Sequence, residues 1–111
     1  MVKSVPIELG GKMRHIRYTT NAICDIETMA GQPIMSVYRS GLVGVRMMLW
    51  GGLKWEEKGL TPNVVGLWLD DYYDEGGKFE KLNESILEAL QNSGFYKSLT
   101  QEEAEQEEKN E

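Results

Sequence analysis

The chain has 111 residues, a length that fits one domain. Its net charge of −6 lies mostly at one end, because six glutamates and one lysine in residues 101–111 contribute −5. The first hundred residues carry only −1 and offer no basic face for nucleic acid. One cysteine excludes an internal disulfide framework, and no apolar run is long enough for a signal peptide or a membrane span. We therefore expect a cytoplasmic protein with one domain, residues 1–99, and an acidic, flexible tail, residues 100–111.

The first predicted element is a β-hairpin. Apolar residues alternate with polar ones along residues 5–9, and Gly10-Gly11 then provides a two-residue turn that tolerates positive φ. The alternation puts these side chains on the apolar faces of the strands: Val5, Ile7, Leu9, Ile16 and Tyr18. Pro6 indicates that the first strand is an edge strand, and such an edge is a candidate surface for self-association.

A first helix is expected directly after the hairpin. Thr19, Thr20 and Asn21 are all suitable caps, and Gly31 ends the helix with Pro33 two residues beyond. Apolar residues recur at intervals of three and four and form one stripe: Ala22, Ile23, Ile26, Met29 and Ala30. Residues 33–41 fit either a short helical turn or a loop.

The next predicted helix runs from Ser40 to about Trp50 and is apolar around most of its circumference, which is typical of a central helix. Arg46 is the exception and must reach water or a carboxylate. Gly51-Gly52 is expected to end this helix, and residues 53–59 are expected to be a connector.

Two further helices complete the predicted fold. Thr61 caps the first, with Pro62 at the position where its missing N–H costs nothing, and Gly76-Gly77 ends it. The second spans about residues 78–93, with one apolar face: Phe79, Leu82, Ile86, Ala89 and Leu90. Three later apolar residues are expected to fold back on the core: Phe95, Tyr96 and Leu99. The fold class is therefore mainly α (α+β), a hairpin followed by four or so packed helices.

The residues that usually carry catalysis do not form a recognisable set. Cys24 lies near a helix start, where a thiol pKa can be lowered, but His15 is the only histidine and no third group is evident. One histidine and one cysteine do not make a structural zinc site. The glycine pairs match no phosphate-binding motif. We therefore expect no enzyme activity, metal or cofactor, and we interpret Cys24 as a packed or partly buried thiol.

Residues 70–77, "DDYYDEGG", form an acidic cluster with two adjacent tyrosines. A calcium loop needs oxygen ligands at alternate positions, and neither possible register, from Asp70 or from Asp71, provides them. The cluster is therefore expected to be a solvated helix end, with a partner-binding patch as the alternative. Carboxylates at a helix C-terminus oppose its dipole, so a basic partner would stabilise this end.

The largest side chains are the candidates for partner binding, because aromatic residues are enriched at interface hot spots. Most of them should lie in the core, and some are expected in an exposed patch. The candidates are Trp50, Trp55, Trp68, Tyr72 and Tyr73. Trp55 is the strongest, since it lies in the connector and outside any periodic apolar stripe.

The order of these features resembles the tail assembly chaperones of long-tailed bacteriophages, especially the type shared with gene transfer agents. Three short motifs after the hairpin carry the resemblance. They are an N-A-x-x-x-x-E helix start at residues 21–27, a leucine-tryptophan-glycine-leucine type of helix end at residues 49–53 and a "GLT…V" helix start at residues 59–65. The resemblance covers roughly residues 5–95.

The resemblance implies a role in phage or prophage tail assembly without enzyme activity. Such chaperones bind the tape measure protein, help recruit tail tube subunits and are absent from the mature virion, so the expected location is the host cytoplasm. Helix-in-groove contacts repeated along one scaffold suit this role. Two alternatives stay open: another phage morphogenesis or connector protein that is retained in the virion, or a small regulatory helical interaction domain.

Overall fold

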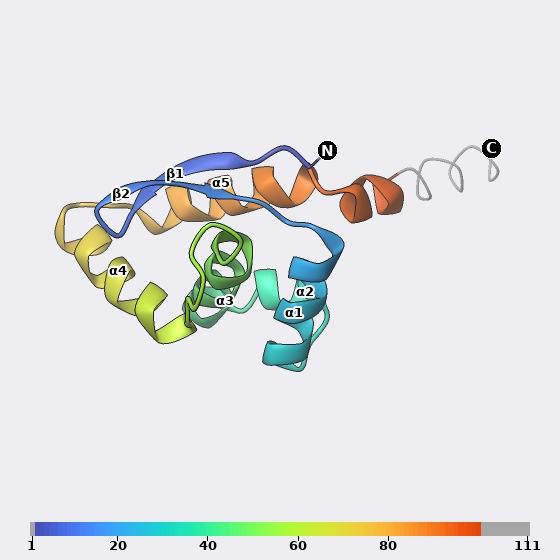
Figure 1. Cartoon of the computed structure of the whole chain (residues 1–111), viewed down its shortest axis with the longest axis horizontal. Helices are drawn as coiled ribbons and strands as arrows, with labels where there is room; N and C mark the ends of the chain where they lie inside the picture. Colours follow the sequence, from blue (N-terminus) through green and yellow to red (C-terminus); the bar gives the residue numbers. More distant parts are fainter. Residues whose placement is uncertain (1, 101–111) are drawn as a thin grey trace.

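The computed structural model describes residues 2–100 and contains the expected antiparallel hairpin followed by helices (Figure 1). The elements are β1 (Val5–Leu9), β2 (Lys12–Ile16), α1 (Thr20–Ala30), α2 (Ile34–Tyr38), α3 (Gly41–Leu53), α4 (Pro62–Asp74) and α5 (Phe79–Gln91). A further helical segment covers residues 94–100. This arrangement confirms the mainly α fold class with an N-terminal hairpin. The expected acidic tail falls almost wholly outside the described residues.

Helix α3 lies at the centre of the fold. It contacts β2 and each of the helices α1, α2, α4 and α5. The hairpin and α5 run along one side of it, α4 lies toward one end of the molecule, and α1 and α2 lie toward the other (Figure 1). The apolar circumference of α3 predicted this central position, although Leu42 and Val43 at its first turn are exposed.

The hairpin forms in the register set by its glycine turn. Gly10 and Gly11 have φ angles of 62° and 80°, and Leu9 pairs with Lys12. The predicted apolar faces are confirmed, because all five side chains are buried: Val5, Ile7, Leu9, Ile16 and Tyr18. The Tyr18 hydroxyl donates a hydrogen bond to the Met48 carbonyl at 2.7 Å, and burial raises the pKa of this phenol well above 10.0.

Two of the predicted helix starts are confirmed by their capping bonds. Thr19 Oγ1 accepts a hydrogen bond from the Ala22 N–H at 3.1 Å, and Gly31 ends α1 in the left-handed conformation. Thr61 Oγ1 accepts from the Val64 N–H at 3.3 Å, with proline at the start of α4. The ambiguous segment after α1 is helical and forms α2.

The prediction that Gly51-Gly52 ends the third helix is wrong, since both glycines are buried within α3. Their role is close packing. A Cβ atom at Gly51 would overlap the side chain of Ile26 in α1. At Gly52 it would lie 2.6 Å from Ile16 Cγ2 and 3.0 Å from Tyr18 Cε1. Glycine therefore lets α3 approach both the hairpin and α1, and this benefit outweighs its low helix propensity.

The apolar face of α5 is confirmed at four positions: Leu82, Ile86, Ala89 and Leu90. Phe79, expected on the same face, is 38% exposed. After α5, Tyr96 packs against the core as predicted, whereas Phe95 is 41% exposed and does not fold back. On α1, Met29 was expected in the apolar stripe but is exposed, because the last turn of this helix extends beyond the neighbouring elements.

Candidate functional site

The five aromatic candidates do not form one patch. Trp50 is buried and its indole N–H donates to the Leu60 carbonyl at 2.9 Å, so it belongs to the core. Trp55 lies on the connector between α3 and α4, bound to the hairpin. Trp68, Tyr72 and Tyr73 are partly buried along α4. The candidate site is therefore reduced to two places, the connector and the exposed side of α4.

Trp55 and the two residues after it fasten the connector to β2. The Trp55 indole N–H donates to the His15 carbonyl at 2.9 Å, and the guanidinium of Arg17 stacks 4.0 Å from the ring centroid. Glu56 accepts hydrogen bonds from the His15 N–H at 2.6 Å, and its other oxygen lies 3.0 Å from the His15 ring. Glu57 pairs with Lys12 and Arg14. These contacts clamp the connector to the hairpin, and Trp55 still keeps 42% of its surface exposed, as predicted.

The same clamp occupies one edge of the hairpin. β2 pairs with β1 along one side, and on its other side His15 binds the connector. Just beyond β2, the Arg17 N–H donates to the Gly52 carbonyl of α3 at 2.9 Å. The connector therefore covers the outer edge of β2 at His15. Self-association through the hairpin stays a prediction, and on the β1 edge Pro6 has no N–H to donate.

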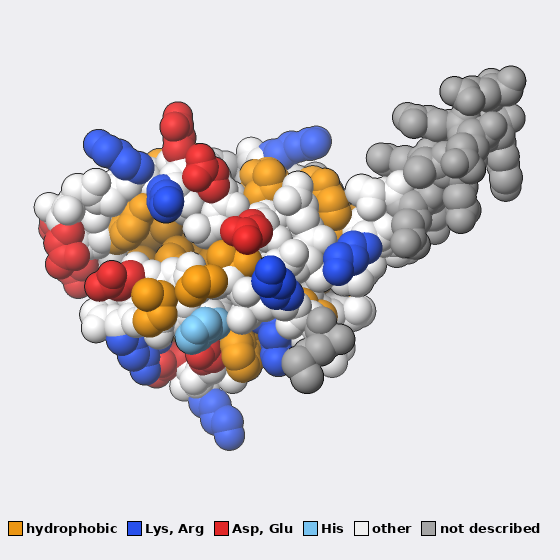
Figure 2. All heavy atoms as spheres, turned by 90° about the horizontal axis from the view of Figure 1, so that it is seen from above, with side chains coloured by type: hydrophobic (Ala, Val, Ile, Leu, Met, Phe, Trp, Pro, Cys, Tyr) orange, Lys and Arg blue, Asp and Glu red, His pale blue; other side chains and the backbone are white. Residues whose placement is uncertain are grey.

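An open groove of about 420 Å³ lies between the hairpin turn and α4, and we call it the turn groove. The hairpin contributes Gly10 and Gly11 at the turn, and α4 contributes the rings of Trp68 and Tyr72. Three carboxylates also line the groove: Glu8, Asp71 and Glu75. Acidic side chains gather at the end of the molecule toward which α4 runs, in the view from above (Figure 2). Aromatic surface and negative charge thus meet in one concave site.

Arg14 and Trp68 hold the two walls of the turn groove together. The Arg14 guanidinium lies 3.7 Å from the centroid of the Trp68 ring. Its Nε donates to the Leu9 carbonyl at 2.6 Å and its Nη2 to the Gly10 carbonyl at 3.2 Å. Gly10 itself lies against the tryptophan, since a Cβ there would approach ring atoms to 2.7 Å. The hairpin turn is therefore fixed on α4.

Tyr72 is held in a defined orientation at the other end of the groove. Its hydroxyl donates to the Lys78 carbonyl at 2.8 Å, and its ring meets that of Tyr73 edge to face with centroids 5.4 Å apart. Burial, and to a smaller extent the neighbouring Tyr72, raises the pKa of Tyr73. Both tyrosines pack partly against the core, and of the two only Tyr72 lines the groove.

The carboxylates of the groove differ from three acidic groups elsewhere in the fold. Glu56, Glu57 and Asp25 each pair with a basic side chain. Within residues 2–100, no hydrogen bond or ion pair reaches the side chain of Glu8, Asp71 or Glu75. The last two also lie at the C-terminal end of α4, where the helix dipole is negative. The groove is thus suited to a cation.

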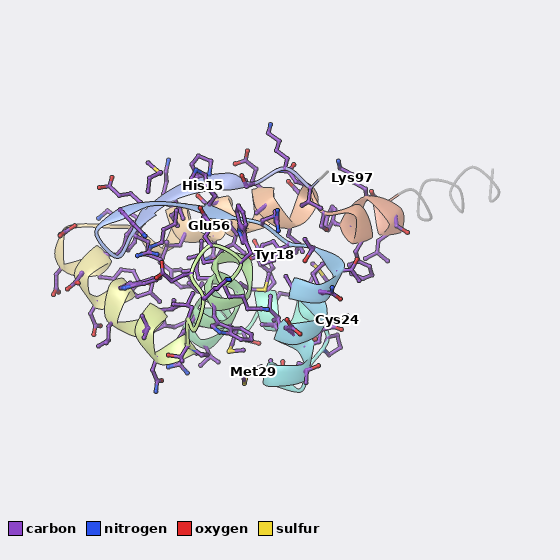
Figure 3. All side chains as sticks on the ribbon, in the orientation of Figure 1. His15, Tyr18, Cys24, Met29, Glu56 and Lys97 are labelled. Carbon is purple, nitrogen blue, oxygen red and sulfur yellow. The ribbon has the colours of Figure 1, made fainter. Side chains whose placement is uncertain are left out.

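The remaining sequence candidates show no catalytic arrangement. Cys24 is exposed on the outer face of α1, a correction to the expected packed thiol, because the buried residues of that helix are its neighbours Ala22, Ile23 and Ile26. His15 lies beside Glu56 on the hairpin, well separated from Cys24 (Figure 3). The described part of the chain has no cluster of three metal-ligating side chains.

Sequence reasoning identified Trp68 and Tyr72 but missed the hairpin side of the groove. Glu8 and Gly10 reach the site only because the turn folds over α4, and this contact joins residues about sixty positions apart. The glycine pair was recognised as a turn, and that was the sole local signal. Arg14 shares the face of Ile16 in the alternation of β2, but its charge gave no reason to expect it to be buried.

No protein-family model, curated protein sequence or solved structure matches this chain. No helix among residues 2–100 is long and apolar enough to cross a membrane.

Proposed function

We propose that this chain is a phage or prophage tail assembly chaperone that binds the tape measure protein and helps to recruit tail tube subunits. Two things support the proposal. The motifs at residues 21–27, 49–53 and 59–65 occur in the order typical of that class. The observation that carries the binding role is the turn groove, which joins aromatic surface to unpaired negative charge.

The geometry of the groove fits a chaperone that must release its partner. Its walls are fixed by Arg14 and Trp68, so little ordering is needed on binding. It is open and small, so each contact with a partner is weak. A long tape measure protein presents many similar segments, and many chaperone copies along it would gain affinity through multivalency. A coat of this kind can then be displaced by tube subunits one copy at a time.

We also propose that the protein acts in the host cytoplasm and is absent from the mature particle. A morphogenesis or connector protein that stays in the virion is the first alternative. Mass spectrometry of purified virions separates the two, since a retained protein is detected in stoichiometric amounts and a chaperone is not. A small regulatory helical domain is the second alternative, and it predicts no affinity for the tape measure protein.

Co-expression with the tape measure protein encoded in the same gene cluster tests the proposed function. We expect the tape measure protein to be insoluble when it is expressed alone. Together with this chain it should stay in the soluble fraction and co-purify with it. Failure to co-purify, with the tape measure protein still insoluble, would overturn the proposal.

A further inference from the structure

We infer that the turn groove binds the side chain of a lysine or arginine that projects from a helical segment of the protein partner. The chemistry of this inference comes from the groove, while the identity of the partner as the tape measure protein rests on the proposed function. The inference adds what the partner must present: a long cationic side chain on a helix surface.

Charge is the first argument. Glu8 approaches the groove from the hairpin, and Asp71 and Glu75 approach it from α4, so negative charge lies on two walls. Lys12 and Arg14 share the single carboxylate of Glu57, so these three groups keep one positive charge beside the groove. Together with the three groove carboxylates the balance is −2, so an incoming cation is still favoured and an anionic ligand repelled.

The aromatic lining is the second argument, and it separates a lysine or arginine from a small ion. Rings of Trp and Tyr attract ammonium and guanidinium groups, and they also pack against the aliphatic stems of those side chains. Trp68 stacks on one guanidinium in this structure, that of Arg14, so an incoming cation must use ring surface that Arg14 leaves free. Tyr72 is fixed by its bond to the Lys78 carbonyl, so its ring is preorganised. A bare metal ion has no aliphatic stem to pack against either ring.

The shape of the groove is the third argument. A volume of about 420 Å³ is larger than one side chain requires, and it leaves space for the adjoining turn of a helix. Gly11, which lines the groove, has no neighbouring atom within 4 Å of where a Cβ would lie. The described residues hold no metal-ligand cluster here, and a side chain delivered by a helix is the occupant that uses charge, rings and space together.

The test uses the full chain, labelled with ¹⁵N, and three matched peptides. The probe is a short alanine-based helical peptide with lysines at positions i and i+4, compared with peptides carrying norleucine or glutamate there. The three indole N–H signals report on different places. Trp50 is buried, Trp55 is bonded to His15, and Trp68 lines the groove. We expect the lysine peptide alone to shift the Trp68 signal saturably, with little change at the other two.

A pair of isosteric double variants provides the control. Asp71→Asn with Glu75→Gln should weaken binding of the lysine peptide by roughly tenfold, the loss expected for two partly exposed ion pairs. Asp70→Asn with Asp74→Asn changes the net charge equally on the same helix, outside the groove, and should weaken binding less than about twofold. Equal losses for both variants, equal binding of the norleucine peptide, or an unmoved Trp68 signal would overturn the inference.

The inference and the proposed function fail separately. If the tape measure protein co-purifies equally with the wild-type chain and with the Asp71→Asn, Glu75→Gln variant, the groove inference is wrong and the chaperone function stands. If the lysine peptide binds in the groove and the tape measure protein does not co-purify, the groove chemistry stands and the proposed partner is wrong.

Discussion

The guanidinium of Arg14 stacks 3.7 Å from the centre of the Trp68 ring and joins the hairpin to α4 beneath the turn groove. Arg14 is almost completely buried, at 6% exposure, and it donates to two turn carbonyls and to Glu57. One side chain thus connects the hairpin turn, α4 and the connector. The fold and the proposed binding surface depend on the same contact.

Glu57, the carboxylate partner of Arg14, gives stability a predictable dependence on pH. The hydrogen bond from Arg14, followed by the charge of Lys12, lowers the pKa of this carboxyl below 4.5. A pKa that is lower in the folded state stabilises the fold above the unfolded-state pKa, and this contribution is lost as pH falls through the lowered value. We expect Glu57→Gln to lower the Tm at neutral pH and to match the wild type at strongly acidic pH.

Thermal unfolding, followed by circular dichroism from neutral to strongly acidic pH, measures the difference in Tm between the wild type and Glu57→Gln. Glu84→Gln is the control, because Glu84 is an exposed residue of α5 without an ion pair in the described part of the chain. Its Tm should follow the wild type at every pH. A gap for Glu57→Gln that stays constant down to strongly acidic pH would show that the pair with Arg14 does not stabilise the fold.

Two helical glycines should respond to alanine in opposite directions. Gly52 lies within 2.6 Å of Ile16 where a Cβ would be placed, so Gly52→Ala should destabilise the protein by about 1–3 kcal/mol. Gly66 in α4 has only Arg46 Cδ at 3.7 Å, an ordinary contact, so Gly66→Ala should stabilise it by up to about 1 kcal/mol. Urea unfolding measures both changes, and a stabilising Gly52→Ala would refute the close-packing role.

The glycine pair within α3 shows which features of the fold could not be predicted from the sequence. Helix starts at Thr19 and Thr61 and the turn at Gly10-Gly11 depend on local bonds, so the sequence predicted them correctly. A glycine pair such as Gly51-Gly52 fits either a helix end or a close helix contact. Only the position of Ile16 and Ile26 in the folded chain decides between the two.

The candidate site shows the same difference between local features, which the sequence predicted, and contacts between distant residues, which it did not. Trp68 and Tyr72 were predicted because they are large aromatic residues beside an acidic helix end. The assignment of Trp50 to a possible binding patch failed because its N–H is satisfied by Leu60 inside the core. Trp55 is exposed as predicted, but its bond to His15 could not be read from spacing, since it joins residues forty positions apart.

Trp55 should contribute to stability through the clamp. Trp55→Ala removes the bond to the His15 carbonyl and the stacking on Arg17, and we expect a loss of about 1–3 kcal/mol. Trp55→Phe keeps a ring under Arg17 and loses only the N–H donor, so about half of that loss is expected. Urea unfolding of both variants checks the order. Equal stability of wild type and Trp55→Ala would mean that the indole is only a surface group.

Cys24 should be dispensable. It is exposed on α1 and makes no side-chain hydrogen bond among residues 2–100. Cys24→Ala is therefore expected to change the free energy of unfolding by less than about 0.5 kcal/mol and to leave tape measure binding intact. Urea unfolding measures the change in stability, and binding assays on the wild type and the variant measure the affinity. A large loss of binding in the variant would point to a role for the thiol that the fold does not indicate.

Binding of the full chain to immobilised tape measure protein, followed by biolayer interferometry, is the most direct test. The wild type and the Asp70→Asn, Asp74→Asn control should bind with similar affinity, and the Asp71→Asn, Glu75→Gln variant should bind roughly tenfold more weakly. Added salt should reduce the difference, because the groove acts through charge. No binding by the wild-type chain would contradict the proposed chaperone function.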